Sequence, residues 1–178
     1  RPRVQAAIAE GWQWLVNEGF LAPHPEQTGG WHFLTRRGKL ARNKADVDAY
    51  RSAVLLPRRM LHPSIAAASW SSFLRGEYDT AVFQAFRELE VSIRVAGDYS
   101  DSDYGVDLVR KAFAVAKNSA AAGTLTDVKR TAAEQEALGH LVAGAIGSYK
   151  NPHSHRKVAL QAEDAVEMII LASHLLKI

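Results

Sequence analysis

The most constraining feature of the sequence is an apolar stripe of helical period between Tyr78 and Val95. Val82, Phe86, Leu89 and Ile93 recur at steps of four, three and four residues, so they share one face of a helix. An apolar face of this length has to be buried against other elements. The stripe therefore predicts a packed helical bundle, and a composition with 47% hydrophobic and 23% charged residues excludes a disordered chain.

Further helices are expected on both sides of this stripe. Pro63 stands where a first helical turn tolerates proline, and Gly76 follows the same segment where helices end. The other expected helices are residues 4–18, 104–117, 132–149 and 159–176, the last with Ala162, Val166, Ile169 and Leu176 on one face. No run of about 20 apolar residues occurs, so we expect no membrane span.

The first sixty residues have a different pattern. Residues 4–18 gather several apolar side chains on one helix face, namely Ala7, Ile8, Gly11, Trp12 and Leu15. Residues 31–35 alternate and predict a short strand, after which Thr35 can cap a turn that includes Gly38 and Leu40. Residues 43–63 are polar and then rich in proline, and we interpret them as a linker or domain boundary. The expected domains are therefore residues 1–60 and 61–178.

Cysteine content and charge limit the chemistry and the partners. The chain has no cysteine, which excludes a disulfide, a thiolate zinc site and a cysteine nucleophile, and fits a cytoplasmic location. It opens without Met and without an apolar signal core, so we expect a piece truncated at its N-terminus. Residues 1–60 carry a net charge of +5 and residues 61–178 one of −2. The basic first part suits an anionic partner.

Two histidines, one asparagine and three cationic residues lie at a predicted helix break, in the segment Tyr149-Lys-Asn-Pro-His-Ser-His-Arg-Lys157. Pro152 interrupts the helix, which can turn several polar side chains toward one point. A histidine exchanges protons near neutral pH, and a cation stabilises charge that develops on a phosphate. An amide can orient the substrate or hold the tautomer of the histidine. These are the parts of metal-independent RNA cleavage, in which the 2′-hydroxyl is the nucleophile. The alternative is a polar loop whose histidines are satisfied.

Two patterns in the sequence could suggest a metal site, but each is incomplete. His153 and His155 have the spacing of paired ligands, but zinc needs at least a third protein ligand, and no other motif supplies one. Four aspartates, Asp98, Asp101, Asp103 and Asp107, lack the glycine and the closing glutamate of a calcium-binding EF-hand loop. We therefore expect no metal and no cofactor.

Three strings resemble a known family. They are Ala143-Gly-Ala-Ile-Gly-Ser-Tyr-Lys-Asn-Pro-His-Ser-His-Arg156, Phe86-Arg-Glu-Leu-Glu-Val-Ser-Ile-Arg94 and Tyr104-Gly-Val-Asp-Leu-Val-Arg-Lys-Ala-Phe113. Together they resemble the Ymh family of uncharacterised bacterial and phage proteins over residues 61–178. That family is similar to the HEPN superfamily of helical domains. The resemblance implies a HEPN-like bundle, a homodimer, and RNase activity in phage defence or a toxin-like role.

The motif of active HEPN domains is an arginine, a polar residue, three variable residues and a histidine. The resemblance places Lys150 at the arginine position, Asn151 at the polar position and His155 at the histidine position. Lysine lacks the bidentate fork of arginine, so this departure either keeps the electrostatic stabilisation with poorer positioning or marks an inactive enzyme. Arg156 is a candidate for a displaced guanidinium, and His153 is a second candidate for the acid.

Glu90 is a further candidate, on the helix with the apolar stripe. Its carboxylate, or that of Glu88, would orient His155 or Lys150 from the neighbouring helix. The alternative is that Glu90 and Arg94 form an ordinary pair four residues apart on a helix surface.

The first sixty residues resemble the back half of a winged-helix domain. The resemblance is carried by Trp12, Trp14, the string Glu18-Gly-Phe-Leu21 and the string Trp31-His-Phe-Leu-Thr-Arg-Arg-Gly38. It implies a two-stranded wing flanked by phosphate-binding cations, Arg36, Arg37, Lys39, Arg42 and Lys44. Residues 31–44 would then contact DNA or RNA. We expect Trp12, Trp14 and Trp31 to lie in the core rather than to stack on bases.

The sequence thus predicts a mainly α protein, in which a small winged-helix-like α+β segment precedes a HEPN-like bundle. The favoured function is a homodimeric, metal-independent endoribonuclease whose substrate is RNA. The alternative is a non-catalytic module that binds nucleic acid or protein and dimerises through its helical domain.

Overall fold

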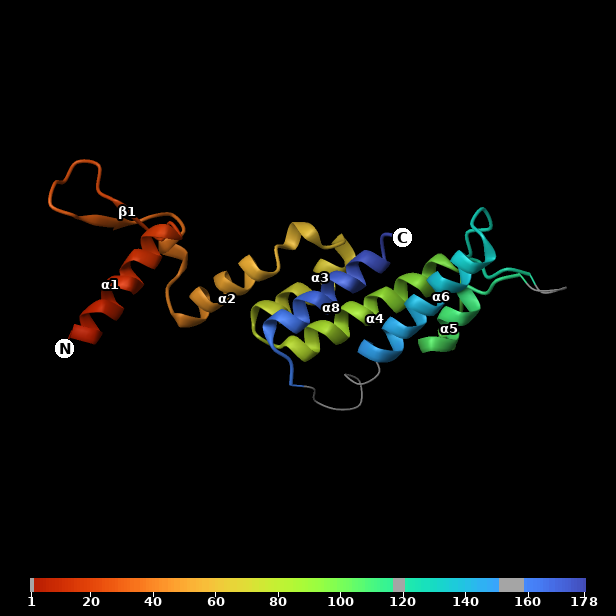
Figure 1. The fold of residues 1–178 in the computed structure, drawn as a ribbon. Helices are drawn as coiled ribbons and strands as arrows, with labels where there is room; N and C mark the ends of the chain where they lie inside the picture. Colours follow the sequence, from red (N-terminus) through yellow and green to blue (C-terminus); the bar gives the residue numbers. More distant parts are fainter. Residues whose placement is uncertain (1, 117–120, 151–158) are drawn as a thin grey trace. The chain divides into compact units, whose positions relative to one another are not determined.

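The computed structural model describes residues 2–116, 121–150 and 159–178 (Figure 1). The chain divides into two compact units, residues 1–51 and 52–178. The fold is mainly helical with one small antiparallel sheet, so the expected fold class is confirmed at this level. Within the described ranges, every helix is too short or too polar to cross a membrane.

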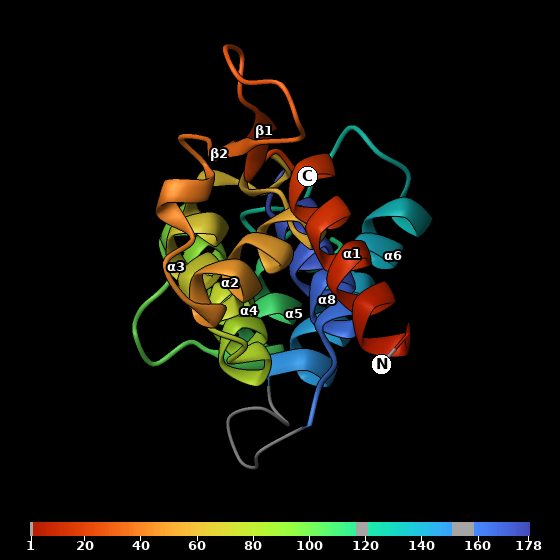
Figure 2. The same cartoon turned by 90° about the vertical axis from the view of Figure 1, so that its left-hand side faces the viewer.

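The first unit contains a helix, a hairpin and a short turn of helix. Its elements are α1 (Pro2–Asn17), β1 (Leu21–Pro23), β2 (His32–Leu34), η1 (Gly38–Leu40) and most of α2 (Lys44–Leu55). The two strands pair antiparallel with Leu21 opposite Leu34, and Figure 2 shows the long loop that joins them. The hydroxyl of Thr35 accepts a hydrogen bond of 3.1 Å from the backbone of Gly38, which confirms the predicted cap.

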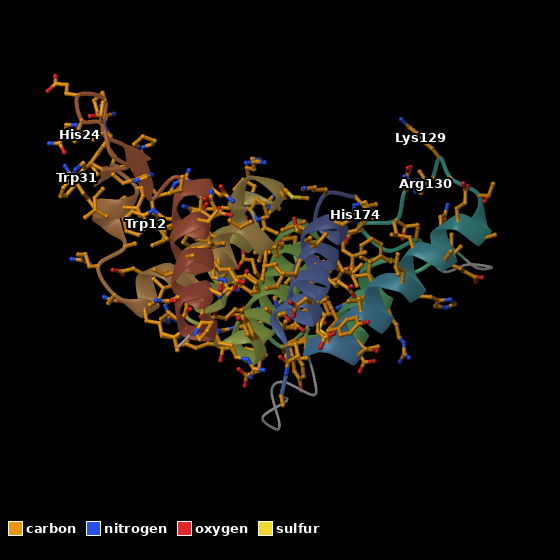
Figure 3. All side chains as sticks on the ribbon, turned by 60° about the vertical axis from the view of Figure 1, so that its left-hand side comes forward. Trp12, His24, Trp31, Lys129, Arg130 and His174 are labelled. Carbon is orange, nitrogen blue, oxygen red and sulfur yellow. The ribbon has the colours of Figure 1, made fainter. Side chains whose placement is uncertain are left out.

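The core of this unit is small and aromatic. Phe20 is buried, with its ring centroid 5.7 Å from that of Trp14 and 4.9 Å from that of Tyr50. The prediction that all three tryptophans lie in the core is wrong, because Trp31 is 65% exposed and Trp12 is 47% exposed. Strands of three residues cannot cover such large side chains. Trp12 and Trp31 are labelled in Figure 3.

The apolar face of α1 is also uncovered. The helix itself is confirmed, and it ends before Gly19, whose φ of 70° suits glycine. None of its residues from Pro2 to Asn17 is buried, and Ile8 is 66% exposed. A unit of this size has too few elements to bury every apolar stripe.

Residues 43–63, predicted as a linker or domain boundary, include the boundary between the two units, and they contain α2 and η2 (Arg58–Met60). The side chain of Asn43 accepts a hydrogen bond of 3.0 Å from the backbone of Asp46 and so caps the start of α2. Leu56, which follows α2, belongs to the second unit and is fully buried. The backbone oxygen of Leu56 accepts a hydrogen bond of 3.1 Å from the indole of Trp70.

The second unit is a helical bundle arranged around one helix. Its elements are α3 (Pro63–Leu74), α4 (Tyr78–Ala96), α5 (Gly105–Ala112), α6 (Ala132–Ala145), η3 (Ile146–Lys150) and α8 (Ala162–Leu175). Helix α4 packs against α3, α8, α5 and η3, and α5 packs against α6. The predicted stripe on α4 is confirmed, since Val82, Phe86, Leu89 and Ile93 are all buried.

Helix α8 is present, but its buried face is rotated from the predicted one. Ala165, Ile169 and Ala172 are buried, whereas Val166 and Leu176 are half-buried at the edges of the face. Helix α8 packs against α4 and α3, and the small side chains of Ala165 and Ala172 beside Ile169 allow a close approach.

Helix α5 ends at Ala112 and not at Lys117. Residues further along the chain donate hydrogen bonds to carbonyls at the end of α5 and just after it. Leu125 donates a bond of 2.9 Å to the oxygen of Ala112, and Gly123 donates one of 2.8 Å to that of Ala114. These bonds replace the helical ones that a longer α5 would have made.

Helix α6 begins with a capping box. The hydroxyl of Thr131 accepts from the backbone of Glu134, and the carboxylate of Glu134 accepts from the backbone of Thr131. Such caps stabilise a helix by about 1 kcal/mol. This one fixes where α6 starts, and thus the register of the segment that carries Lys150.

Candidate functional site

The most unusual side chain in the second unit is Glu90, a carboxylate that is only 3% exposed in the middle of the bundle. Its Oε2 accepts a hydrogen bond of 2.7 Å from Nζ of Lys150 and another of 2.7 Å from the backbone N–H of Gly105. Its Oε1 lies 3.4 Å from Nη2 of Arg94. A buried charge is costly unless it is paired, and here it has two cations and a backbone donor.

Lys150 reaches Glu90 because of the conformation of η3. This element continues α6 as one π-helical turn, a form that is rare and frequent at functional sites. Tyr149 stacks on Phe86 at 5.3 Å, and the next residue, Lys150, bonds to Glu90, one turn further along α4. Two successive residues of η3 therefore dock on the same face of α4.

Glu90 also binds the start of α5. The residue before this helix, Tyr104, makes no side-chain cap, and Gly105 has a φ of 64°. The carboxylate of Glu90 takes the place of a cap by accepting from the first backbone N–H, where negative charge is favoured. One carboxylate thus joins α4, η3 and the beginning of α5.

The loop before α5 is tied to the same region. The Nε of Arg94 donates a hydrogen bond of 3.0 Å to the backbone oxygen of Asp103. The carboxylate of Asp103 accepts one of 2.9 Å from Lys111 and two more from Ser100. The bond from Lys111, followed by those from Ser100, lowers the pKa of Asp103 below its ordinary value. The acidic loop is therefore an ordered turn built by its own hydrogen bonds.

The structure brings together two of the predicted catalytic residues, Lys150 and Glu90. The Lys150 side chain is 16% exposed, and the bond to Glu90 uses one of the three N–H donors of its ammonium. The other four predicted residues, Asn151, His153, His155 and Arg156, lie outside the described residues. The surface-pair alternative for Glu90 and Arg94 does not hold, because both side chains are largely buried.

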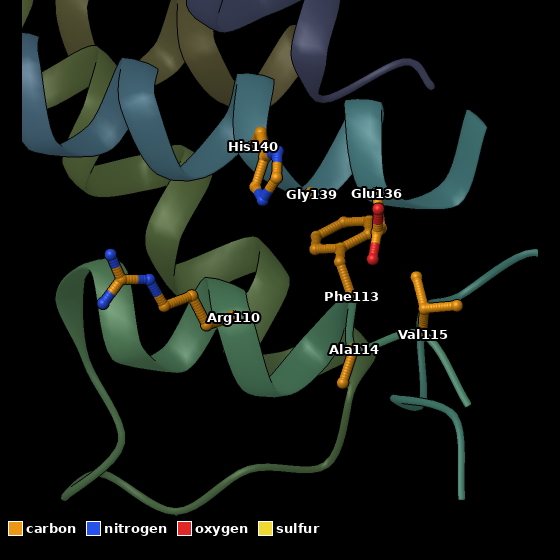
Figure 4. Close-up of a pocket in the computed structure, with 7 residues that line it drawn as sticks. All are labelled: Arg110, Phe113, Ala114, Val115, Glu136, Gly139 and His140. Carbon is orange, nitrogen blue, oxygen red and sulfur yellow. The ribbon is translucent and has the colours of Figure 1, made fainter. Parts of the chain in front are cut away.

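An open groove lies beside this junction, between α5 and α6. Two adjoining cavities, of about 210 and 530 Å³, share Arg110 and His140 in their lining. Figure 4 shows the smaller cavity, with Phe113 between the two helices. The larger cavity extends to Gly147 and Ser148, which belong to η3. No sequence pattern assigned a site role to Arg110 or His140, since the two residues are far apart in the chain.

Three of the predicted basic residues of the first unit, Arg37, Arg42 and Lys44, interact with other residues of that unit. Arg37 donates to the backbone oxygen of Glu18 and lies over the ring of Tyr50, so it holds the unit together. Arg42 pairs with Asp46 at 3.5 Å, and Lys44 pairs with Asp48 at 2.5 Å.

Arg36 and Lys39 are exposed and make no ion pair within the described part of the chain. All five predicted basic residues are exposed, and two of them, Arg42 and Lys44, also form surface ion pairs.

The acidic cluster and the histidines do not form a metal site in the described ranges, where no group of three His, Asp or Glu side chains converges. The two histidines of the H-x-H spacing, His153 and His155, lie outside those ranges.

Comparison with known proteins assigns the second unit. No curated protein and no solved structure matches the chain significantly. A family model described as "Protein of unknown function (Hypoth_ymh)" matches residues 59–178, which is more than half of the chain. The resemblance to the Ymh family is therefore confirmed, and the chain belongs to the Hypoth_ymh family.

Proposed function

We propose that this protein is a metal-independent endoribonuclease of the HEPN type that acts in phage defence or in a toxin-like role. The observation that carries the proposal is the bond between Lys150 and the buried carboxylate of Glu90. Lys150 is the first residue of the motif that continues through Asn151 to His155. A cation that is fixed at the end of η3 gives this motif a rigid starting point.

The proposed reaction is an internal transfer of the phosphodiester. His155 takes the proton of the RNA 2′-hydroxyl, and the resulting oxygen attacks the adjacent phosphorus. The bond to the 5′-oxygen breaks, and that oxygen receives a proton from a second histidine. The products are a 2′,3′-cyclic phosphate and a free 5′-hydroxyl. Proton transfer of this kind contributes about 10²–10⁴-fold to the rate.

The cations stabilise the charge that develops during this transfer. The ammonium of Lys150 retains donors beyond the one that Glu90 accepts, and these face the phosphate oxygens in the proposed complex. Arg156 supplies a guanidinium next to His155. Asn151 orients the substrate or the histidine. Glu90 is a positioning residue, since it acts through Lys150.

A homodimer completes the proposed site. Each chain provides one copy of the motif, and two copies supply a base and an acid from separate histidines. His153 of the same chain is the alternative acid.

The test is RNA cleavage by the purified protein with and without EDTA. We expect cleavage that survives EDTA and that His155→Ala abolishes. His174→Ala is the matched control, because it removes an exposed imidazole of α8 that is not part of the motif (Figure 3). Cleavage that EDTA removes, or that His155→Ala retains, would overturn the proposal.

A second candidate function rests on the first unit. Trp31 is exposed at the hairpin, and Arg36 and Lys39 extend from the turn that follows β2. Exposed aromatic and cationic side chains are the usual contacts to nucleic acid. In this alternative the hairpin is the wing of a winged-helix-like module that binds DNA, and the helical unit serves for dimerisation. Loss of DNA binding in the double variant Arg36→Gln/Lys39→Gln, with no RNA cleavage by the parent protein, would favour it.

A further inference from the structure

We infer that the groove between α5 and α6 binds one nucleotide of a single-stranded RNA, with its phosphate between Arg110 and His140. This inference rests on the proposed function, because it names where the substrate strand runs beside the motif. The groove is open to solvent and is lined by the same two side chains along both of its cavities.

The size and the lining of the groove fit this ligand. The larger cavity, of about 530 Å³, lies within the range of about 300–1,000 Å³ typical of small-molecule sites. Its lining is mostly apolar, with few polar groups, which is the usual composition of such sites. Ala143, Gly144 and Gly147 leave the room that the ligand fills, since a Cβ at Gly144 would meet nothing within 4 Å.

The charges place the phosphate in the larger cavity. Arg110 and His140 line it, and no acidic side chain does so among the described residues. Among the described residues Arg110 pairs with the exposed Asp107, at 3.6 Å, and its own side chain is 71% exposed. An exposed ion pair of this kind contributes little to the stability of the protein. The guanidinium can therefore turn to a phosphate and bind it in bidentate geometry.

The smaller cavity then receives the base. Phe113 presents its ring there between the two helices (Figure 4), and every base has a face that stacks on an aromatic ring. At its other end the groove reaches Ser148, two residues before Lys150. A strand bound in the groove would therefore lead toward the motif.

The experiment measures binding of a fluorescein-labelled, 2′-O-methylated RNA oligonucleotide, which cannot be cleaved through its 2′-oxygen. Fluorescence anisotropy gives the dissociation constant. We expect Arg110→Gln to weaken binding about tenfold, the value of one charge-assisted contact. The matched control is Arg130→Gln, because Arg130 forms the same i,i+3 pair with an aspartate but lines neither cavity.

A second variant blocks the groove without removing charge. Gly144→Leu places a side chain in the open space, and we expect it to weaken binding by at least about tenfold while the melting temperature is unchanged or raised. Its control is Gly11→Leu, a helical position in α1 that is equally open.

Several results would overturn the inference: no binding by the parent protein, parent-like affinity in both groove variants, or displacement of the oligonucleotide by equimolar free AMP. These results are separate from the nuclease test. Groove-dependent binding without any cleavage would leave the inference standing and refute the nuclease. Cleavage that depends on His155 but not on Arg110 or Gly144 would support the nuclease and refute the inference about the groove.

Discussion

The Nζ atom of Lys150 lies 2.7 Å from Oε2 of Glu90, which is itself buried in the centre of the helical unit. The residue that begins the proposed catalytic motif is therefore bound to the core and is not part of a free loop. The same carboxylate accepts from the first N–H of α5, so the motif, the central helix and one wall of the groove share a single anchor.

Breaking this pair from one side should destabilise the protein strongly. Glu90→Leu leaves the Lys150 ammonium half-buried without its carboxylate, and we expect a loss of about 3 kcal/mol in the free energy of unfolding. The double variant Glu90→Leu/Lys150→Met should lose less than the sum of the two single changes, since neither charge then remains. Urea denaturation of the three variants measures these differences, and strictly additive losses would show that the two side chains do not interact.

Two glycines of the second unit should respond oppositely to the same change. A Cβ at Gly123 would lie 2.3 Å from the backbone oxygen of Ala112, so Gly123→Ala must displace the loop that closes α5. A Cβ at Gly144 meets open space in a helix, so Gly144→Ala should raise stability by roughly 1 kcal/mol. Thermal unfolding compares them directly. Equal melting temperatures for the two variants would contradict the packing described for Gly123.

The different burial of two apolar helix residues predicts different effects of their substitution on stability. Ile169 is fully buried where α8 meets the bundle, and Ile169→Ala should cost about 3 kcal/mol through lost contacts and a residual cavity. Val95 is exposed on α4, and Val95→Ala should change stability by less than about 0.5 kcal/mol. Chemical denaturation measures both, and a small effect at Ile169 would place the core elsewhere.

Acid should destabilise the second unit through specific carboxylates. The pKa of Asp103 is lowered mainly by the bond from Lys111, and that of Glu134 mainly by the bond from Thr131. The folded state therefore binds fewer protons than the unfolded state. Its extra stability is complete above the unfolded pKa values, near 4, and is lost as pH falls through the lower folded values.

Melting temperatures between neutral pH and pH 3 measure this loss. In Asp103→Asn the decrease should be smaller than in the parent protein, because one of the responsible carboxylates is missing. An unchanged acid profile in that variant would show that Asp103 does not contribute.

Local signals predicted the helices well and the tertiary contacts poorly. Pro63 and Gly76 delimited α3 correctly, and the stripe on α4 is buried as its period indicated. The start of α2 was missed because a single capping side chain, Asn43, determines it within a polar segment. The early end of α5 depends on a loop that returns from residues 121–126, which no local pattern reveals.

The candidate site shows the same division. The motif and a candidate role for Glu90 could be predicted from the sequence, because the resemblance to a HEPN-like bundle implies that the helix of Glu90 neighbours the motif. The groove could not, since it is lined by residues of α5 and α6, among them Arg110 and His140, and a long loop separates these helices in the chain. The exposure of Trp31 was also missed, because residue type favours burial while the small first unit has nothing to cover the ring.

The most direct test of the central claim is the chemistry of the RNA ends that the protein produces in the presence of EDTA. Labelled RNA is incubated with the parent protein and with His155→Ala, and the termini are identified by mass spectrometry. The proposed mechanism predicts 2′,3′-cyclic phosphates and 5′-hydroxyls from the parent protein and no products from the variant. Intact RNA with the parent protein, or 5′-phosphate and 3′-hydroxyl ends, would contradict it.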